Sequence, residues 1–287
     1  DLVKLRDEYN DHENGYKSIP LAIEFNTYDL LTKNSYSTLD LYGHALLPKQ
    51  RMINYYFQSP FSSNYFNANS YLGRYHYFGF QDPKLSFALG NISSNRPTTT
   101  LSGNGAKASY RIGKHEIGGL YVREPNFFND FYLSGYGGSY TYQSKNILLD
   151  AYYQRKDNNY SKVKTDLYTA MTNIRLTKTQ NLRLGVGYSR ENHYWDPNNS
   201  FDLPGYHYRL FYSGSFKKLR FSLVNYYGSK NYAEFRGIFS ASSNINYRFN
   251  EKHNTSLGAT HMTTSPEFYK EGQKLPTDIF TEKDLIS

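Results

Sequence analysis

The chain of 287 residues has no cysteine, a single tryptophan and no long apolar run. Without cysteine, neither a disulfide framework nor a thiolate metal site is available. A helix that crosses a bilayer needs about 20 mostly apolar residues, and no stretch of this sequence approaches that pattern. The sequence therefore excludes a helical membrane protein. It does not exclude a membrane β-barrel, whose strands alternate apolar and polar residues.

Hydrophobic residues make up only 38% of the chain, yet aromatic residues reach 18%, with 31 Tyr and 19 Phe. An ordinary globular domain is about 45–50% apolar. Much of the apolar surface here is therefore carried by rings, which favour β-strands over helices. The formal charge of +8 suits an anionic partner such as nucleic acid, anionic lipid or an anionic solute, but selects none of them.

Alternation of apolar and polar residues is the dominant pattern. Between residues 181 and 190, Leu184, Val186 and Tyr188 point one way, while Arg183 and Ser189 point the other. About fifteen segments of roughly 8–13 residues follow this period of two. A strand that crosses a membrane needs about 9–11 residues, whereas strands of soluble sandwiches cluster near 5–6. Segment length therefore favours the membrane.

The connections between these segments alternate between short and long. Short turns that carry lysine occur at 48–50, 113–114 and 217–218, among others, and longer loops fall between them, as at 93–101, 157–161 and 193–203. Outer-membrane barrels have short turns at one end and long loops at the other. We therefore predict an all-β fold, an up-and-down antiparallel transmembrane β-barrel of about 14–16 strands, or part of a larger barrel.

The expected domain organisation has three parts. Residues 1–18 are a charged lead segment, residues 19–263 form the barrel, and residues 264–287 form a C-terminal loop or partial strand. Fifteen strands is an odd number, and bacterial single-chain barrels usually have an even one. We therefore expect a further strand in one of the two terminal segments, or a chain that is part of a longer one.

The Tyr-rich strands with short Lys turns resemble Gram-negative outer-membrane β-barrel proteins over roughly residues 19–263. Within them, Leu89-Gly90-Asn91-Ile92 followed by residues 103–110 resembles the early barrel of fimbrial ushers, although Asn91 stands where the usher pattern has Asp. The resemblance implies a place in the bacterial outer membrane, contact with the lipid bilayer and passage of a solute. Ushers secrete folded pilus subunits, which would make a translocated polypeptide the cargo.

The residues opposite the apolar faces are mostly basic. If the apolar faces meet lipid, these residues line the lumen, where poorly screened positive charge favours anions. Alternatively, arginine and acid side chains pair and fill the interior, as in small barrels. A barrel of this size is too wide to be filled in that way, so an aqueous passage is favoured. The predicted lumen-lining residues are Arg74, His76, Lys107, Arg111, Arg175, Arg183, Arg209, Arg220 and Arg248.

A polar and aromatic cluster, His193-Tyr194-Trp195-Asp196, falls in an expected long loop. It is interpreted either as a surface contact for sugar or protein, or as an ordinary packed loop. Histidines are dispersed without metal-ligand spacing, so neither a metal nor a cofactor is expected. Pairs such as Ser213 and His207, or Asp196 and His193, are weak evidence for an enzyme, because catalytic partners meet in space, not in sequence. We expect no enzyme, and no nucleic-acid binding, because the lysines lie in turns.

The predicted function is a basic-lined aqueous passage through the outer membrane for an anionic solute or polypeptide, with possible partner subunits. One alternative is a barrel anchor that presents its loops within a secretion or adhesion assembly. Another is a soluble all-β carbohydrate-binding protein, in which the apolar faces would be buried between two stacked sheets.

Overall fold

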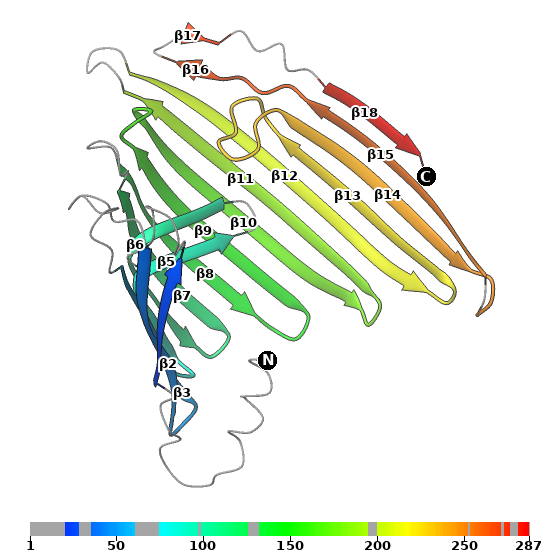
Figure 1. The fold of residues 1–287 in the computed structure, drawn as a ribbon. Helices are drawn as coiled ribbons and strands as arrows, with labels where there is room; N and C mark the ends of the chain where they lie inside the picture. Colours follow the sequence, from blue (N-terminus) through cyan, green and yellow to red (C-terminus); the bar gives the residue numbers. More distant parts are fainter. Residues whose placement is uncertain are drawn as a thin grey trace. The chain divides into compact units, whose positions relative to one another are not determined.

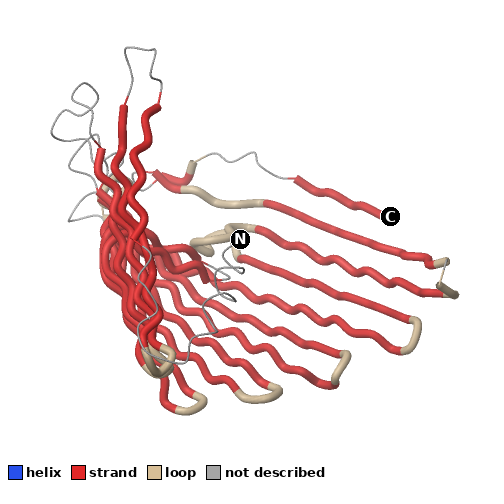
Figure 2. Tube along the Cα trace, turned by 60° about the horizontal axis from the view of Figure 1, so that its bottom comes forward, coloured by secondary structure: helices blue, strands red, loops and turns tan. Residues whose placement is uncertain are grey.

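A computed structural model describes residues 21–28, 36–60, 75–96, 99–125, 132–194, 200–251, 253–270, 273–275 and 281–286. Strands dominate these residues (Figure 2). Among them, no helix is long and apolar enough to cross a membrane.

Sixteen strands form one antiparallel sheet in which neighbours in the chain pair with each other, and β18 follows β15 (Figure 1). This confirms the expected up-and-down antiparallel fold. The sixteenth strand, β18, lies in the terminal segment 264–287 and pairs with β15. The strands of this sheet are β1 (Leu21–Tyr28), β2 (Tyr36–Leu47), β3 (Arg51–Pro60), β4 (Tyr75–Gln81), β5 (Leu85–Arg96), β6 (Thr99–Ile112), β7 (His115–Pro125), β8 (Tyr132–Gln143), β9 (Ile147–Asn158), β10 (Val163–Thr177), β11 (Gln180–His193), β12 (Phe201–Phe216), β13 (Leu219–Gly228), β14 (Ile238–Arg248), β15 (Asn254–Thr264) and β18 (Thr281–Ile286). A separate two-stranded sheet contains β16 (Tyr269–Lys270) and β17 (Gln273–Lys274).

The short turns have the backbone that tight hairpins need. Lys49 and Gln50 have φ angles of 64° and 58°, and Lys217 has 51°. Positive φ matches the right-handed twist of the flanking strands. In the β4–β5 turn, Asp82 Oδ1 accepts hydrogen bonds from the backbone amides of Lys84 and Leu85 at 2.7 and 2.6 Å, which lowers the pKa of Asp82.

Of two expected loops, one is mostly strand and the other begins later than expected. β5 extends to Arg96 and β6 begins at Thr99, so most of the expected loop 93–101 is paired, and β9 extends to Asn158 into the expected loop 157–161. The expected loops begin too early in the sequence because the hydrogen bonds between paired strands are made by the backbone. A strand end can therefore carry polar side chains and still pair.

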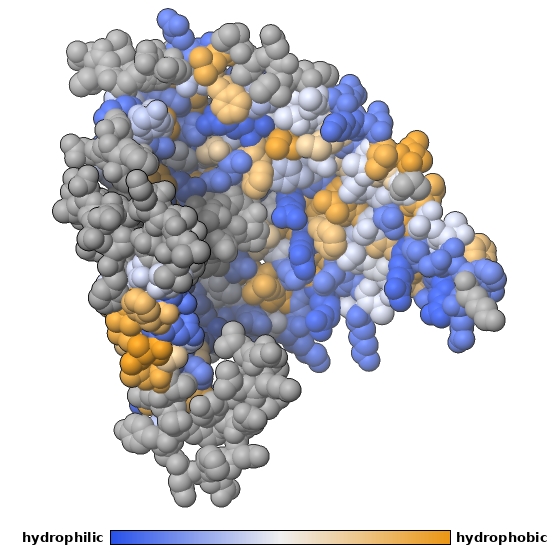
Figure 3. Space-filling view, in the orientation of Figure 1, coloured by the Kyte–Doolittle hydropathy of each residue, from blue (hydrophilic) through white to orange (hydrophobic). Residues whose placement is uncertain are grey.

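The chain forms two compact units, and in each unit one sheet face carries exposed apolar side chains. The first unit comprises Asp1–Asn95, Thr100–Ile112 and Gly118–Ser134. On β1, Ile23 and Phe25 share a face, and Phe25 is 64% exposed. Figure 3 shows apolar side chains gathered over β1 and its neighbours. We call this the apolar face, and the opposite one the polar face.

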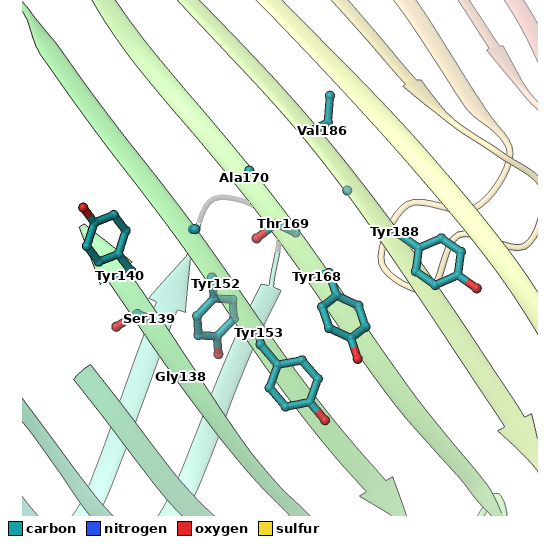
Figure 4. Close-up of a pocket in the computed structure, with 12 residues that line it drawn as sticks. Gly138, Ser139, Tyr140, Tyr152, Tyr153, Tyr168, Thr169, Ala170, Val186 and Tyr188 are labelled. Carbon is teal, nitrogen blue, oxygen red and sulfur yellow. The ribbon is translucent and has the colours of Figure 1, made fainter. Parts of the chain in front are cut away.

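The second unit comprises Arg96–Thr99, Gly113–Ile117 and Gly135–Ser287, and its apolar face carries a row of tyrosines. The strand register places Tyr153, Tyr168 and Tyr188 side by side, with neighbouring ring centroids 4.9 and 6.3 Å apart (Figure 4). One step further along the strands, the same face carries the ion pairs Arg155–Asp166 and Arg190–Asp202. On the other side of the row lies an open groove of about 670 Å³, lined by Ala151, Ala170 and Val186 among others.

Candidate functional site

The register brings the predicted basic residues of the second unit to its polar face. Arg183 lies opposite Phe211, and its guanidinium carbon is 5.4 Å from the centre of that ring. Arg209 lies opposite Tyr226, and Arg220 opposite Ser215. The same pairing places two further members on this face. The arginine set consists of Arg175, Arg183, Arg209, Arg220 and Arg248.

No member of the arginine set forms an ion pair with an acid in the described part of the chain. Asp150, an acid on the same face, instead accepts a hydrogen bond from Thr141 Oγ1 at 2.6 Å. A sheet face that carries guanidinium groups without neighbouring carboxylates to neutralise them keeps a positive electrostatic potential. The alternative in which arginines and acids pair and fill the interior therefore does not describe this set.

In the first unit, Lys107 and Arg111 lie on the polar face. Ser86 Oγ and Ser109 Oγ are 2.8 Å apart, which fixes the polar side of β6, and both basic residues share the parity of Ser109. Lys107 Nζ donates to the carbonyl oxygen of Ser93 at 3.4 Å. Arg74 lies outside the described residues.

His76 is placed differently from the prediction. It lies opposite Phe57 and therefore on the apolar face of β4. Tyrosines occupy one face of this strand and phenylalanines the other, so both faces are aromatic and alternation alone could not indicate which parity faces which side. The backbone amide of His76 donates to Asn91 Oδ1 at 2.8 Å.

The connection between β13 and β14, residues 229–237, bends back over the polar face of β9–β12 (Figure 1). We call it the folded-back loop. Tyr232 at its centre is fully buried, with its ring centroid 4.5 Å from that of His207. The backbone amide of Ala233 donates to Ser189 Oγ at 3.1 Å. The folded-back loop is thus packed tightly against the polar face of the sheet.

Two ion pairs hold the folded-back loop to strands β9 and β11. Lys156 Nζ on β9 is 2.7 Å from Glu234 Oε1. Arg236 forms an ion pair with Glu191 on β11, whose side chain is buried. Because both pairs are partly or fully withdrawn from water, they are screened less than surface pairs.

Glycines in β11 and β12 make room for the loop. A Cβ atom at Gly187 would lie 2.3 Å from the His207 ring, and one at Gly205 would lie 2.5 Å from the carbonyl oxygen of Asn231. Strand glycines often mark the close approach of another backbone. In the structure, Gly187 and Gly205 leave the space that Tyr232 and its neighbouring backbone occupy.

Several polar atoms around Tyr232 are buried without a hydrogen-bond partner in the described part of the chain. Both ring nitrogens of His207 and the hydroxyls of Tyr226 and Tyr232 are buried without a hydrogen bond in the described part of the chain. Burial also raises the pKa of Tyr232. An unsatisfied buried polar group costs about 1–3 kcal/mol. The packed position of the loop is therefore less stable than its apolar contacts alone would make it.

A second segment, residues 265–270 and 273–275, packs beside the loop. Arg236 Nη1 donates to the carbonyl oxygen of Glu267 at 3.3 Å. The Glu267 carboxylate accepts hydrogen bonds from Lys274 Nζ at 2.8 Å and from the Tyr269 hydroxyl at 3.2 Å. The Lys274 contact is the main cause of a lowered pKa of Glu267.

The predicted loop cluster at 193–196 is only partly described. His193 is the last residue of β11 and is buried, with its ring stacked on Phe201 at 4.9 Å, because it pairs with Val163 and Phe201 in the sheet. The expectation that His193 lies in a long loop is therefore corrected. The Tyr194 hydroxyl donates to Asp157 Oδ1 at 2.7 Å. Trp195 and Asp196 lie outside the described residues.

The structure does not bring together one of the imagined catalytic pairs. His207 and Ser213 lie on the same strand, and six residues of extended chain span about 20 Å. At the sheet edge, His261, Glu282 and Asp284 bring possible ligand atoms within 4.8 Å of one another. These side chains are partly or fully exposed. His261 Nδ1 lies 2.7 Å from Asp284 Oδ1, so these two groups pair with each other.

No known family profile matches the chain, and no curated protein matches it. Several solved structures are similar to it. A mutant of the Rhodopseudomonas blastica porin is 12% identical, covering 88% of this chain and 93% of its own, with a TM-score of 0.42. Outer membrane protein OpdK from Pseudomonas aeruginosa is 9% identical, covering 84% and 80%, with a TM-score of 0.45. An OccD1 (OprD) variant is 9% identical, covering 80% and 70%, with a TM-score of 0.44.

Proposed function

We propose that this chain spans a bacterial outer membrane, with its apolar face against acyl chains and its polar face along a water-filled passage for an anionic solute. The apolar side of β12 supports this, because it runs without a charge from Tyr206 to Phe216. Ten residues extend about 33 Å along a strand, and a tilt of about 40° reduces this to roughly 25 Å across the membrane. That is the height of the apolar band of outer-membrane barrels.

The order of residues along the apolar face supports the same orientation. Small apolar side chains give way to the row Tyr153, Tyr168 and Tyr188, and then to the charged pairs Arg155–Asp166 and Arg190–Asp202. Aromatic rings with a polar hydroxyl are favoured at the headgroup level, and charges beyond it. A soluble protein has no physical reason for this order.

The single observation that carries the anion preference is that the arginine set has no ion-pair partners among the described residues. The folded-back loop occupies part of the same polar face, which would narrow the passage. A narrowed passage suits a small solute better than a folded polypeptide, so we favour the solute as cargo.

Ion selectivity in planar bilayers tests this proposal. The wild-type chain should conduct, and its reversal potential in a salt gradient should show anion preference. Arg183→Glu combined with Arg209→Glu should shift the preference toward cations, because both side chains line the passage. Lys145→Glu, in the exposed β8–β9 turn, is the matched control and should shift it less.

Two outcomes would count against the proposal. Unchanged selectivity in the double arginine variant would remove those residues from the lining. A chain that inserts in bilayers but never conducts would instead support a barrel that anchors surface loops.

A further inference from the structure

The polar face of β1–β4, in the first unit, is acidic. Glu24 on β1 lies directly opposite Asp40 on β2. Like charges directly opposite each other on one face destabilise a sheet. Among the described residues, this face of the four strands carries no lysine or arginine, since Arg51 pairs with Leu47 on the apolar face.

Asp40 is the less satisfied of the two acids. It is only 6% exposed. Its Oδ2 accepts a hydrogen bond from Asn26 Nδ2 at 3.2 Å, whereas its Oδ1 has no hydrogen-bond partner in the described part of the chain. A buried carboxylate normally has a cation or a full set of donors. This one has neither, which points to a positively charged group that comes from outside the chain.

An open aromatic cavity of about 500 Å³, shallow and facing solvent, lies next to this carboxylate. It is lined by Tyr56, Gln58, Tyr75 and Tyr77, and Gln58 lies directly opposite Asp40. The Tyr56 and Tyr75 rings meet edge to face at 5.2 Å. Tyrosine ring faces attract cations within about 6 Å, and groups of aromatic rings recognise ammonium ligands in this way.

A second tyrosine links the cavity to the other acid. Tyr42 stacks on Tyr56 with ring centroids 6.1 Å apart. Its hydroxyl donates a short hydrogen bond to Glu24. The rings and the Glu24 carboxylate therefore form one continuous surface on the polar face, in which the buried Asp40 lies between Glu24 and Gln58.

We propose that this surface binds the ammonium group of a small organic cation, with the tyrosine rings around its methyl or methylene groups and Asp40 supplying the opposite charge. A metal ion fits less well, because Ca²⁺ requires six to eight oxygen ligands, and the cavity wall is mostly ring carbon. A neutral solute would leave the buried charge of Asp40 uncompensated. This site is separate from the arginine set and does not depend on the proposed anion preference.

Binding of choline to the full chain in detergent, measured by isothermal titration calorimetry, tests the proposal. The matched ligand is 3,3-dimethylbutan-1-ol, which has the same shape without the charge. We expect it to bind at least about tenfold more weakly than choline. Asp40→Asn should weaken choline binding by about tenfold or more and leave binding of the alcohol unchanged. Asp284→Asn, at the exposed edge strand β18, is the matched control and should leave both affinities unchanged.

A second variant keeps the test independent of the folding of Asp40→Asn. Tyr75 is 42% exposed, so Tyr75→Leu should fold and should also weaken choline binding. Equal affinity for choline and the alcohol, or choline binding that neither variant changes, would overturn the proposal. Displacement of choline by micromolar Ca²⁺ would overturn it in favour of a metal site. A chain that binds choline but does not conduct would overturn the proposed passage and leave this site standing.

Discussion

The ring of Tyr232, in the folded-back loop, lies 4.5 Å from the ring of His207 on the polar face of β12. Neither the Tyr232 hydroxyl nor either ring nitrogen of His207 has a hydrogen-bond partner in the described residues. Apolar packing holds the loop down, while buried polar atoms oppose it. Lifting the loop would hydrate these atoms, so the free-energy difference between the packed and lifted positions is reduced by their presence.

Removing one of these polar atoms should hold the loop down more firmly. Tyr232→Phe keeps the ring and deletes only the unpaired hydroxyl, which should favour the packed position by about 1 kcal/mol, or about fivefold. Amide hydrogen exchange in residues 229–237 should slow by that factor. Tyr160→Phe, at an exposed turn, is the control. Faster exchange in Tyr232→Phe would mean that the hydroxyl has a partner when the loop is packed.

Adding a methyl group at Gly205 should have the opposite effect and weaken the packing of the folded-back loop. A Cβ at Gly205 would meet backbone atoms of Asn231 and Tyr232 at 2.5 Å, so Gly205→Ala should displace the loop. Single-channel conductance should then rise. Gly185→Ala is matched in its chemistry and face, but its nearest neighbour is the flexible Met171 side chain at 3.3 Å, so it should leave the conductance unchanged. If both variants conduct like the wild type, the loop does not narrow the passage.

The ion pair between Arg236 and Glu191 should be the stronger attachment of the loop. Glu191 is 5% exposed, and Arg236→Gln would leave its charge with His193, 3.4 Å away, as its one remaining ion-pair partner among the described residues. Breaking a buried pair from one side costs about 3 kcal/mol. We expect the loop to lift and proteolysis within residues 229–237 to accelerate. The double variant with Glu191→Gln should recover part of the protection, and no recovery would indicate that the pair does not hold the loop.

The segment of residues 265–270 and 273–275 should loosen in acid. The pKa of Glu267 is lowered, mainly by the Lys274 hydrogen bond. A lowered pKa means that the stabilisation is complete above the ordinary pKa of glutamate, about 4.3, and is lost as the pH falls through the lowered value. Hydrogen exchange in this segment, corrected for intrinsic rates, should rise below about pH 4. Glu267→Gln should remove that pH dependence, and a persistent rise in the variant would assign it to another group.

The parts of the structure that follow from local alternation could be predicted from the sequence. The period of two along β11 places Val186 and Arg183 on opposite faces without reference to any other strand. The folded-back loop could not be predicted in that way. Its position depends on Gly187, Gly205 and Ser189, which are distant in sequence from Tyr232 and which alternation treats as ordinary strand residues. The predicted face of His76 is wrong because both faces of β4 carry aromatic residues, so the sequence does not indicate which face is the polar one.

The environment of the apolar face can be tested with a single charge. Val186 is 59% exposed and lies just past the tyrosine row toward the apolar band. If this face meets acyl chains, Val186→Arg should destabilise the chain in lipid vesicles by about 1–2 kcal/mol, because the cost of a lipid-facing arginine falls from about 2–4 kcal/mol at the membrane centre to about 0–1 kcal/mol at the interface, where the tyrosine row lies. Ser213→Arg, on the polar face of β12, should cost far less, because its charge would reach water. Urea titration of vesicle-inserted protein measures both. In a water-soluble protein Val186 would already be exposed to water, so equal and small effects of the two substitutions would show that the apolar face does not contact lipid.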